Sequence, residues 1–365
     1  MSRIAILSRD LTAADAVSND VLAMHRLLSE RGHEVKVFVD STSLTVREIS
    51  PYNEALSHLT SPEDVLLYHH SIGWDAGVEI FKTARCRKIV KYHNVTPSYF
   101  FEGISERHQH LCSSGKSQVK DVVECGPDLL LADSAFNQTD LTAAGSDEDK
   151  TFVLPPFNHA EQLQAGVADL EILDSDRGES VNLLAVGGLR PNKGHAALIE
   201  AFAIYALQFN RHARLFLVGA ETQALSNYGM ILRQIINTWD IDSRVVFTGT
   251  ITNESLKAYY LIADALLTTS EHEGFCVPLV EAMAMKVPII AYGSTAIPET
   301  TQDAGLILNQ RDPYLMAQSI DSLLSNETAK IALVARGFDR YEQCFSNHAI
   351  EKQFLDVTTR AGFHF

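Results

Sequence analysis

The chain has 365 residues, of which 46% are hydrophobic and 21% charged, a balance that predicts a globular protein with two domains. Its formal net charge is −16, spread over both halves of the chain. An acidic chain without a basic half disfavours nucleic-acid binding, so we expect no nucleic-acid partner.

The cysteines argue against a disulfide framework or a zinc site, because they are odd in number, scattered and without CxxC spacing. We therefore expect no metal site and a reducing compartment. The apolar run near the N-terminus is too short for a signal peptide, and no stretch approaches the roughly 20 apolar residues that span a bilayer. The expected location is the cytoplasm, with the inner face of a membrane as the alternative.

Short apolar runs alternating with helical patterns predict a parallel sheet in the first half. The first strand is expected at residues 4–7, and a helix at 20–31 is expected to be capped near Ser18 or Asn19. Further strands are predicted at residues 35–39, 64–70, 87–94, 128–134 and 151–156. The loop after the first strand lacks GxGxxG, so the sequence gives little support for a dinucleotide-binding site.

Histidines stand at the ends of two neighbouring predicted strands. In open α/β sheets, ligands bind at the carboxyl ends of the strands, which makes these side chains candidates for a site. For His69 and His70 we favour the alternative of satisfied, partly buried side chains. His93 is the stronger functional candidate, because it opens the loop that leads to Tyr99 and the two phenylalanines after it.

A local basic cluster precedes and enters one of these strands: Lys82, Arg85, Arg87, Lys88 and Lys91. Such a cluster can contact anionic lipid head groups. On an acidic domain we favour the alternative, a solvated face of a helix and the following strand.

Residues 166–179 are rich in Asp and Glu and are expected to connect the two domains. A buried strand then enters a glycine loop at Gly187 and Gly188, and a helix is expected at residues 196–208. Arg190 and Lys193 lie between this strand and this helix. Because glycines let the backbone approach closely and the helix end is positive, the arrangement predicts a pyrophosphate site. The alternative is an exposed turn with solvated charges.

Strands at residues 214–219 and 245–249 each end in glycine, the first in Gly219. After a helix beginning near Asn253, a strand is predicted at residues 263–269 and a helix at 278–285.

Two carboxylates flank the start of that second helix: Glu273 in the loop and Glu281 about one turn into the helix. A pair facing one crevice suits a ligand rich in hydroxyl groups, with an anion favoured at the helix N-terminus. The alternative is that both are solvated surface charges.

The stretch at residues 271–284, Glu-His-Glu-Gly-Phe-Cys-Val-Pro-Leu-Val-Glu-Ala-Met-Ala, resembles the Glu-x7-Glu signature of the retaining GT4 glycosyltransferases. The resemblance implies the α/β GT-B fold, with two Rossmann-like parallel-sheet domains facing a central cleft. It places an acceptor-binding domain at residues 1–165, with a helix at 346–365 crossing back onto it, and a nucleotide-sugar-binding domain at 180–345.

The resemblance also implies roles for individual residues. Glu273 and His93 would contact the donor sugar, Glu281 the ribose, and Lys193 the diphosphate. The family's diphosphate arginine falls at Gly188 in this chain, and Arg190 would replace it. The remaining donor contacts would come from Gly187, Gly188, Gly219, Gly274 and Phe275. In the first loop, residues 14–20 stand where the family often carries paired glycines.

The implied function is retaining, metal-independent transfer of a hexose from a UDP- or GDP-sugar, such as GDP-mannose, to a hydroxyl acceptor. The implied acceptor is a cell-envelope polysaccharide or a lipid-linked glycan, and no cofactor is expected besides the nucleotide-sugar donor. Two alternatives stay open: a sugar-nucleotide epimerase, and a non-catalytic sugar-nucleotide-binding or scaffold protein of the same fold. A phosphorylase-like enzyme would need a longer chain and a pyridoxal phosphate lysine.

Overall fold

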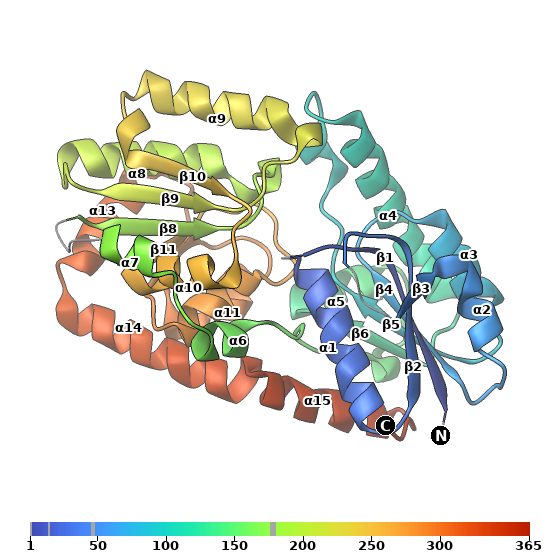
Figure 1. Cartoon of the computed structure of the whole chain (residues 1–365). Coiled ribbons are helices and arrows are strands. Elements are labelled where there is room, and N and C mark those ends of the chain that lie inside the picture. Colours follow the sequence, from blue (N-terminus) through green and yellow to red (C-terminus); the bar gives the residue numbers. More distant parts are fainter. Residues whose placement is uncertain (1, 14, 45–47, 176–179) are drawn as a thin grey trace. The chain divides into compact units, whose positions relative to one another are not determined.

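The computed structural model describes residues 2–13, 15–44, 48–175 and 180–365 (Figure 1). Its contacts divide the chain into two compact units. Unit 1 comprises Met1–Tyr99, Glu106–Asn158 and Phe345–Phe365, and unit 2 comprises Phe100–Ser105 and His159–Cys344. Ala14 of the first loop and residues 176–179 of the expected connection lie outside the described residues.

Unit 1 is built on a seven-stranded sheet of order β3-β2-β1-β4-β5-β6-β7, in which every pairing is parallel. The strands are β1 (Arg3–Leu11), β2 (Glu34–Thr42), β3 (Ile49–Pro51), β4 (Val65–His70), β5 (Arg87–Tyr92), β6 (Leu129–Ala132) and β7 (Thr151–Val153). The direction of strand addition reverses between β1 and β4. This reversal is the topological switch point, where the carboxyl ends of parallel strands open a ligand site.

The helices of unit 1 are α1 (Ala16–Glu30), α2 (Ala55–His58), α3 (Asp75–Thr83), α4 (Glu106–Glu124), α5 (Ala135–Ala143) and α15 (Asn347–Arg360). The predicted cap of α1 at Ser18 or Asn19 is wrong. The Asp15 carboxylate accepts the Ser18 N–H at 2.9 Å, so the helix begins at Ala16. The first strand also runs beyond the predicted residues, because β1 stays paired with β2 as far as Leu11.

The hydrophobic core of unit 1 contains residues from both the N-terminal and the C-terminal parts of the chain. Ile4 and Ile6 of β1 pack in one cluster with Met24 of α1 and with Phe354 and Phe363 at the C-terminal end, all of them buried. Each such side chain contributes about 1.5–3 kcal/mol when fully buried. The burial of its apolar residues explains why α15 belongs to this unit although it follows unit 2 in sequence.

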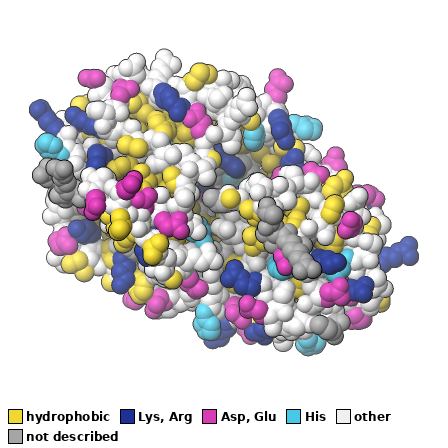
Figure 2. All heavy atoms as spheres, viewed as in Figure 1, with side chains coloured by type: hydrophobic (Ala, Val, Ile, Leu, Met, Phe, Trp, Pro, Cys, Tyr) yellow, Lys and Arg dark blue, Asp and Glu magenta, His cyan; other side chains and the backbone are white. Residues whose placement is uncertain are grey.

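The basic cluster predicted at residues 82–91 does not form as a solvated set. Lys91 is fully buried, and its ammonium pairs with the Asp133 carboxylate at 2.6 Å. The Arg87 guanidinium donates to the carbonyl oxygens of Gly362 and Ala361 and lies over the Phe363 ring. On the face shown in Figure 2, basic and acidic side chains are interspersed.

Unit 2 is built on a six-stranded parallel sheet of order β10-β9-β8-β11-β12-β13. The strands are β8 (Asn182–Val186), β9 (Arg214–Val218), β10 (Val245–Gly249), β11 (Ala265–Thr268), β12 (Ile289–Tyr292) and β13 (Leu306–Leu308). Here the direction of strand addition reverses between β8 and β11. The two parallel-sheet α/β domains expected from the sequence are therefore present.

The helices of unit 2 are α6 (Ala160–Ala165), α7 (Leu170–Ser175), α8 (His195–Gln208), α9 (Ser226–Thr238), α10 (Asn253–Ile262), α11 (Val277–Ala284), α12 (Ile297–Thr301), α13 (Pro313–Leu324) and α14 (Glu327–Arg340). They cover both faces of the sheet (Figure 1), which explains its continuous apolar strands. The cap of α10 is Thr252 rather than Asn253. In the part of the chain that the structure describes, no helix is long and apolar enough to cross a membrane.

Candidate functional site

Glycines bring the backbones of β8 and β9 close together at the unit 2 switch point. Gly187 has φ +144° and donates its N–H to the Val218 carbonyl at 2.8 Å. A Cβ on Gly219, which has φ +155°, would lie 2.1 Å from the Gly187 carbonyl oxygen. Because a side chain at Gly219 would collide with backbone, only glycine fits there. The result is a strand edge whose backbone a ligand can approach closely.

Lys193 and Glu273 meet at this edge from the loops after β8 and β11. The Lys193 ammonium donates to both carboxylate oxygens of Glu273, at 2.7 and 2.9 Å. Burial acts to lower the pKa of Lys193, but the Glu273 carboxylate outweighs it and holds that pKa above its ordinary value. The Lys193 side chain keeps 22% of its surface exposed, so this charged pair is still open to a ligand.

The turn that carries Lys193 packs directly on the loop after β11. Gly194 ends the turn with φ +66°, and a Cβ there would lie 2.2 Å from the Thr269 carbonyl oxygen. The Asn192 side-chain amide donates to the His272 carbonyl at 3.0 Å, and the Asn192 carbonyl accepts the Glu271 N–H at 2.8 Å. These contacts fix the approach of Lys193 to Glu273.

Arg190 lies exposed beside Gly188. A Cβ built on Gly188 would be 3.8 Å from the Arg190 Nε, so the Arg190 side chain passes next to the position where the family's arginine would start. Helix α8 begins five residues later, at His195. Its N-cap residue is Gly194, which has no side chain, and the Tyr228 hydroxyl interacts with the backbone N–H groups of His195 and Ala196.

Glu281 lies on α11 with a separate set of partners. The Tyr260 hydroxyl donates to Glu281 Oε2 at 2.6 Å, and His159 Nε2 lies 3.4 Å from Oε1. Burial, followed by the charge of Glu281, raises the pKa of Tyr260 well above its ordinary value. Glu273 and Glu281 are 7% and 3% exposed, so the alternative that both are solvated surface charges is wrong.

Gly274 and Phe275 occupy the turn between Glu273 and α11. Gly274 is half-buried. The Phe275 side chain is buried, and its carbonyl oxygen accepts the Thr300 hydroxyl at 2.8 Å. Phe275 therefore supports the loop that carries Glu273.

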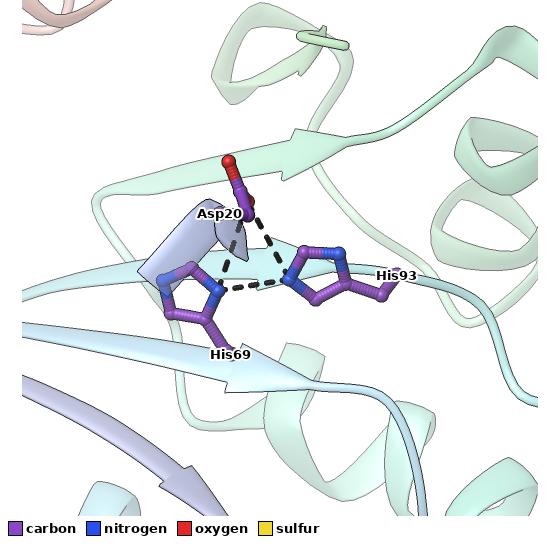
Figure 3. A group of neighbouring side chains, drawn as sticks. All are labelled: Asp20, His69 and His93. Carbon is purple, nitrogen blue, oxygen red and sulfur yellow. Dashed lines mark hydrogen bonds and ion pairs between the residues drawn. The ribbon is translucent and has the colours of Figure 1, made fainter. Parts of the chain in front are cut away.

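His93 lies in unit 1, in a buried cluster at the carboxyl ends of the strands (Figure 3). Its Nε2 is 2.8 Å from Nδ1 of His69, the last residue but one of β4. The carboxylate of Asp20, on α1, points at both rings, with Oδ2 3.6 Å from His93 Nε2 and 3.8 Å from His69 Nδ1. Among the described residues, these three form a group of metal-ligating side chains whose donor atoms all lie within 4.8 Å of one another.

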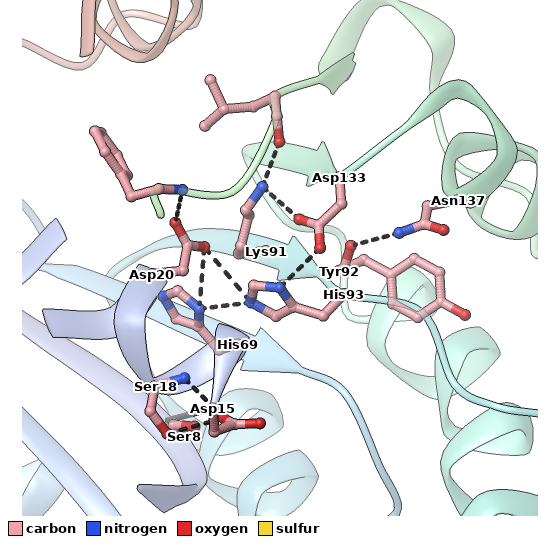
Figure 4. A network of polar contacts seen from close by, with 12 residues as sticks. Ser8, Asp15, Ser18, Asp20, His69, Lys91, Tyr92, His93, Asp133 and Asn137 are labelled. Carbon is pink, nitrogen blue, oxygen red and sulfur yellow. Dashed lines mark hydrogen bonds and ion pairs between the residues drawn. The ribbon is translucent and has the colours of Figure 1, made fainter. Parts of the chain in front are cut away.

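A second layer of polar groups surrounds this cluster (Figure 4). His93 Nδ1 donates to Asp133 Oδ2 at 2.9 Å, and the Lys91 ammonium pairs with Asp133 Oδ1 and also donates to the Leu154 carbonyl. Asp20 Oδ1 accepts the Phe157 N–H at 2.8 Å. The cluster is thus held by α1 and by the strand ends β4, β5 and β6.

Burial dominates the electrostatics of the cluster. It raises the pKa of Asp20 and lowers that of His69 well below its ordinary value. Burial also acts to raise the pKa of Asp133, but the charges of His93 and Lys91 outweigh it and hold that pKa below its ordinary value.

His70 differs from its neighbour His69, although we expected both to be satisfied. Its Nε2 donates to the Gly115 carbonyl at 2.9 Å, and its Nδ1 accepts the Tyr68 hydroxyl at 3.2 Å. Both nitrogens of His70 are therefore satisfied. His69 is buried as expected, but its Nε2 has no hydrogen-bond partner among the described residues.

Sequence reasoning missed Asp20, Asp133, Tyr260 and His159, and it named His69 but favoured a satisfied, partly buried side chain for it. The strand-end position of Asp133 is a signal that could have found it. Tyr260 and His159 carry no such signal, because only the fold brings them to Glu281.

Residues 180–326 match the family model described as "Glycosyl transferases group 1". The chain is 25% identical over 160 residues to O-antigen chain mannosyltransferase B of Escherichia coli, covering 44% of this chain and 41% of that protein. It is 25% identical over 223 residues to a GDP-mannose-dependent alpha-(1-6)-phosphatidylinositol monomannoside mannosyltransferase of Mycobacterium tuberculosis, covering 58% and 56%. The chain thus spans about half the length of these curated relatives.

Solved structures match over nearly the whole chain. Sucrose-phosphate synthase from Thermosynechococcus elongatus aligns with a TM-score of 0.78 at 18% identity, covering 99% of both chains. Anabaena HepE in complex with UDP-glucose aligns with a TM-score of 0.75 at 16% identity, covering 98% of this chain and 100% of HepE. At these identities the likeness shows the fold. The chain therefore has the two Rossmann-like domains of the GT-B fold, and its residues 180–326 are similar to the glycosyl transferases group 1 family.

Proposed function

We propose that this chain is a retaining glycosyltransferase that moves a sugar from a nucleotide-sugar donor to a hydroxyl acceptor. The observation that carries the proposal is the Lys193–Glu273 pair, held at 2.7 and 2.9 Å beside the glycine-lined ends of β8 and β9. A cation next to closely approachable backbone at the start of a helix suits a diphosphate. The match of residues 180–326 to a glycosyltransferase family supports the same assignment.

In this proposal the unit 2 residues stabilise the leaving group. As the bond between the sugar C1 and the phosphate oxygen breaks, the electron pair stays on the diphosphate. Lys193, Arg190 and the Gly188 N–H meet the growing negative charge, and Gly187 leaves the backbone open to close approach, so no metal ion is needed for it. The acceptor oxygen bonds to C1 on the face that the diphosphate leaves, and its proton passes to a diphosphate oxygen.

Glu273 and Glu281 position the donor. Glu273 holds Lys193 and presents its carboxylate to the sugar hydroxyls, with Gly274 and Phe275 shaping its loop. Glu281, oriented by Tyr260 and His159, accepts hydrogen bonds from the ribose. Gly219 leaves room for the base, and His93 is proposed to contact the sugar.

The relatives suggest which donor to test first. Two of them are named as mannosyltransferases, and the name of one specifies GDP-mannose. HepE, by contrast, is known in complex with UDP-glucose. We therefore propose GDP-mannose as the first donor and UDP-glucose as the second, with a cell-envelope polysaccharide or lipid-linked glycan as the acceptor.

The test is to offer these two donors to the purified chain, measuring melting temperature and release of nucleoside diphosphate with a glycan acceptor. A donor that binds the native state raises its melting temperature by mass action. Binding with nucleotide release and a new anomeric bond of unchanged configuration supports the proposal. Binding without release identifies a non-catalytic binding protein, and isomerised sugar nucleotide without release identifies an epimerase; either contradicts the proposal.

A further inference from the structure

We propose that Asp20, His69 and His93 form a site for a divalent first-row transition-metal cation in unit 1. The inference does not rest on the proposed glycosyltransferase function, although both proposals use His93. The site also differs from the sequence-based expectation that the chain has no metal site. These three residues are far apart in the chain and therefore show no recognisable spacing of metal ligands.

The first argument is geometric. Asp20 Oδ2, His69 Nδ1 and His93 Nε2 form a triangle with sides of 2.8, 3.6 and 3.8 Å. A point equidistant from its three corners lies about 2.0 Å from each, which is the distance at which Zn²⁺ binds histidine nitrogen and carboxylate oxygen. The three donor atoms therefore surround a position of the correct size for such a cation (Figure 3).

The second argument is the lone pairs that converge there. With its Nδ1–H given to Asp133 at 2.9 Å, His93 directs Nε2 at His69 Nδ1. Two ring nitrogens 2.8 Å apart need either a proton or a cation between them. Asp20 Oδ2 is fully buried, has no hydrogen-bond partner among the described residues and points at the same position. A buried carboxylate oxygen in that state favours positive charge beside it.

The third argument is the layer behind the ligands. A metal-binding histidine generally donates its other N–H to a carboxylate or carbonyl, which fixes the ring and its tautomer. Asp133 does this for His93, and Lys91 neutralises Asp133 at 2.6 Å. Lys91 also acts on the Asp20 charge, but its direct pair is with Asp133, so a cation between the rings would give Asp20 a direct partner of opposite charge.

The donor set decides the class of cation. Two imidazoles and one carboxylate suit Zn²⁺ and its neighbours among the transition metals, whereas Mg²⁺ and Ca²⁺ prefer oxygen ligands. A cation on His93 Nε2 occupies the nitrogen that a sugar hydroxyl would use. Cation binding and the proposed sugar contact of His93 therefore exclude one another.

The experiment is calorimetric titration of the full chain, freed of metal by dialysis, with Zn²⁺ and separately with Mg²⁺. We expect one Zn²⁺ per chain in the wild type and no stoichiometric binding of Mg²⁺. Asp20→Asn keeps an oxygen that can accept the Phe157 N–H but removes the charge, so the fold should persist while Zn²⁺ affinity falls about 100-fold or more. Asp133→Asn, behind the ligands, should cost about 10- to 100-fold.

Two further variants make the result decisive. His69→Ala removes a ligand and should weaken binding as Asp20→Asn does. His110→Ala removes an exposed histidine on α4 and should leave the affinity unchanged. The proposal is overturned by a wild type without stoichiometric Zn²⁺ binding, which would leave a proton between His69 and His93. It is equally overturned by unchanged affinity in Asp20→Asn and His69→Ala, or by loss of binding in His110→Ala.

Discussion

In both sheets, charged side chains lie at the topological switch point. These side chains are buried in unit 1 and partly exposed to solvent in unit 2. In unit 1 the switch-point cluster is sealed, with the side chains of Asp20, His69 and His93 no more than 4% exposed. In unit 2 the Lys193 side chain at the switch point remains 22% exposed beside glycine-lined backbone. Charges without solvent must be satisfied by one another or by an enclosed ion, whereas partly exposed charges can hold an exchangeable ligand. The same topology therefore supports a structural cluster in one unit and a proposed substrate site in the other.

The largest expected effect is on the stability of the buried cluster in unit 1. Asp133→Ala leaves the fully buried Lys91 ammonium without its carboxylate, and we expect the free energy of unfolding to fall by about 3–5 kcal/mol. Urea denaturation measures this change in the free energy of unfolding. The matched control is Asp356→Ala, which breaks the exposed pair with Arg360 and should cost less than about 0.5 kcal/mol. Equal losses in the two variants would contradict the contrast between sealed and open charges.

At the partly exposed site of unit 2, the expected loss is in turnover. Lys193→Ala removes the cation proposed to meet the departing diphosphate, and turnover with the donor that the chain accepts should fall about 10²- to 10³-fold. The melting temperature should also fall, because the buried Glu273 carboxylate loses its partner, so turnover is compared between folded proteins well below both melting temperatures. Lys330→Ala, on α14 and paired with Glu327, is the control and should keep full turnover. Undiminished turnover in Lys193→Ala would remove Lys193 from the site.

The packing that positions Lys193 can be tested with two glycines of nearly equal conformation. Gly194 and Gly126 have φ of +66° and +64°, but a Cβ would strike the Thr269 carbonyl only at Gly194 and has nothing within 4 Å at Gly126. Gly126→Ala should cost about 1–2 kcal/mol of stability for the left-handed backbone. Gly194→Ala should cost about 3 kcal/mol or more, because Thr269 must also move. Similar midpoints in thermal denaturation would mean that the turn is not held against Thr269.

A smaller effect is expected with pH and should appear in both units. Burial lowers the pKa of His70 in unit 1 and of His195 in unit 2 to about 4, against an ordinary value of 6.5. Because the unfolded chain binds these protons more readily, stability is full above about pH 6.5 and falls as the pH drops toward 4, by at most about 3 kcal/mol per histidine. His70→Phe should show a shallower loss when stability is measured between pH 7 and 4. A slope equal to that of the wild type would mean that protonation of His70 is not part of acid unfolding.

Local patterns predicted much of this molecule. Every strand of the unit 1 sheet except β3, most strands of the unit 2 sheet, the glycine loop after β8 and the helix that carries Glu281 lie where apolar runs and turn residues indicate them. Strand and helix periodicity is a property of neighbouring residues, which is why it can be read locally. Boundaries were less accurate, as at α1, where Asp15 caps the helix in place of Ser18 or Asn19.

What only the tertiary structure decided are the contacts between residues far apart in the chain. Lys193 and Glu273 are 80 positions apart, and His69 reaches His93 from a neighbouring strand across 24. Lys91 illustrates the reason: its sequence neighbours indicate a solvated basic face, yet the sheet buries it against Asp133. The sequence by itself determined the two α/β domains and the candidate donor residues. Sheet pairing determined which charges are sealed and which remain open, because burial depends on the elements that pack above each strand end and not on the residues beside it.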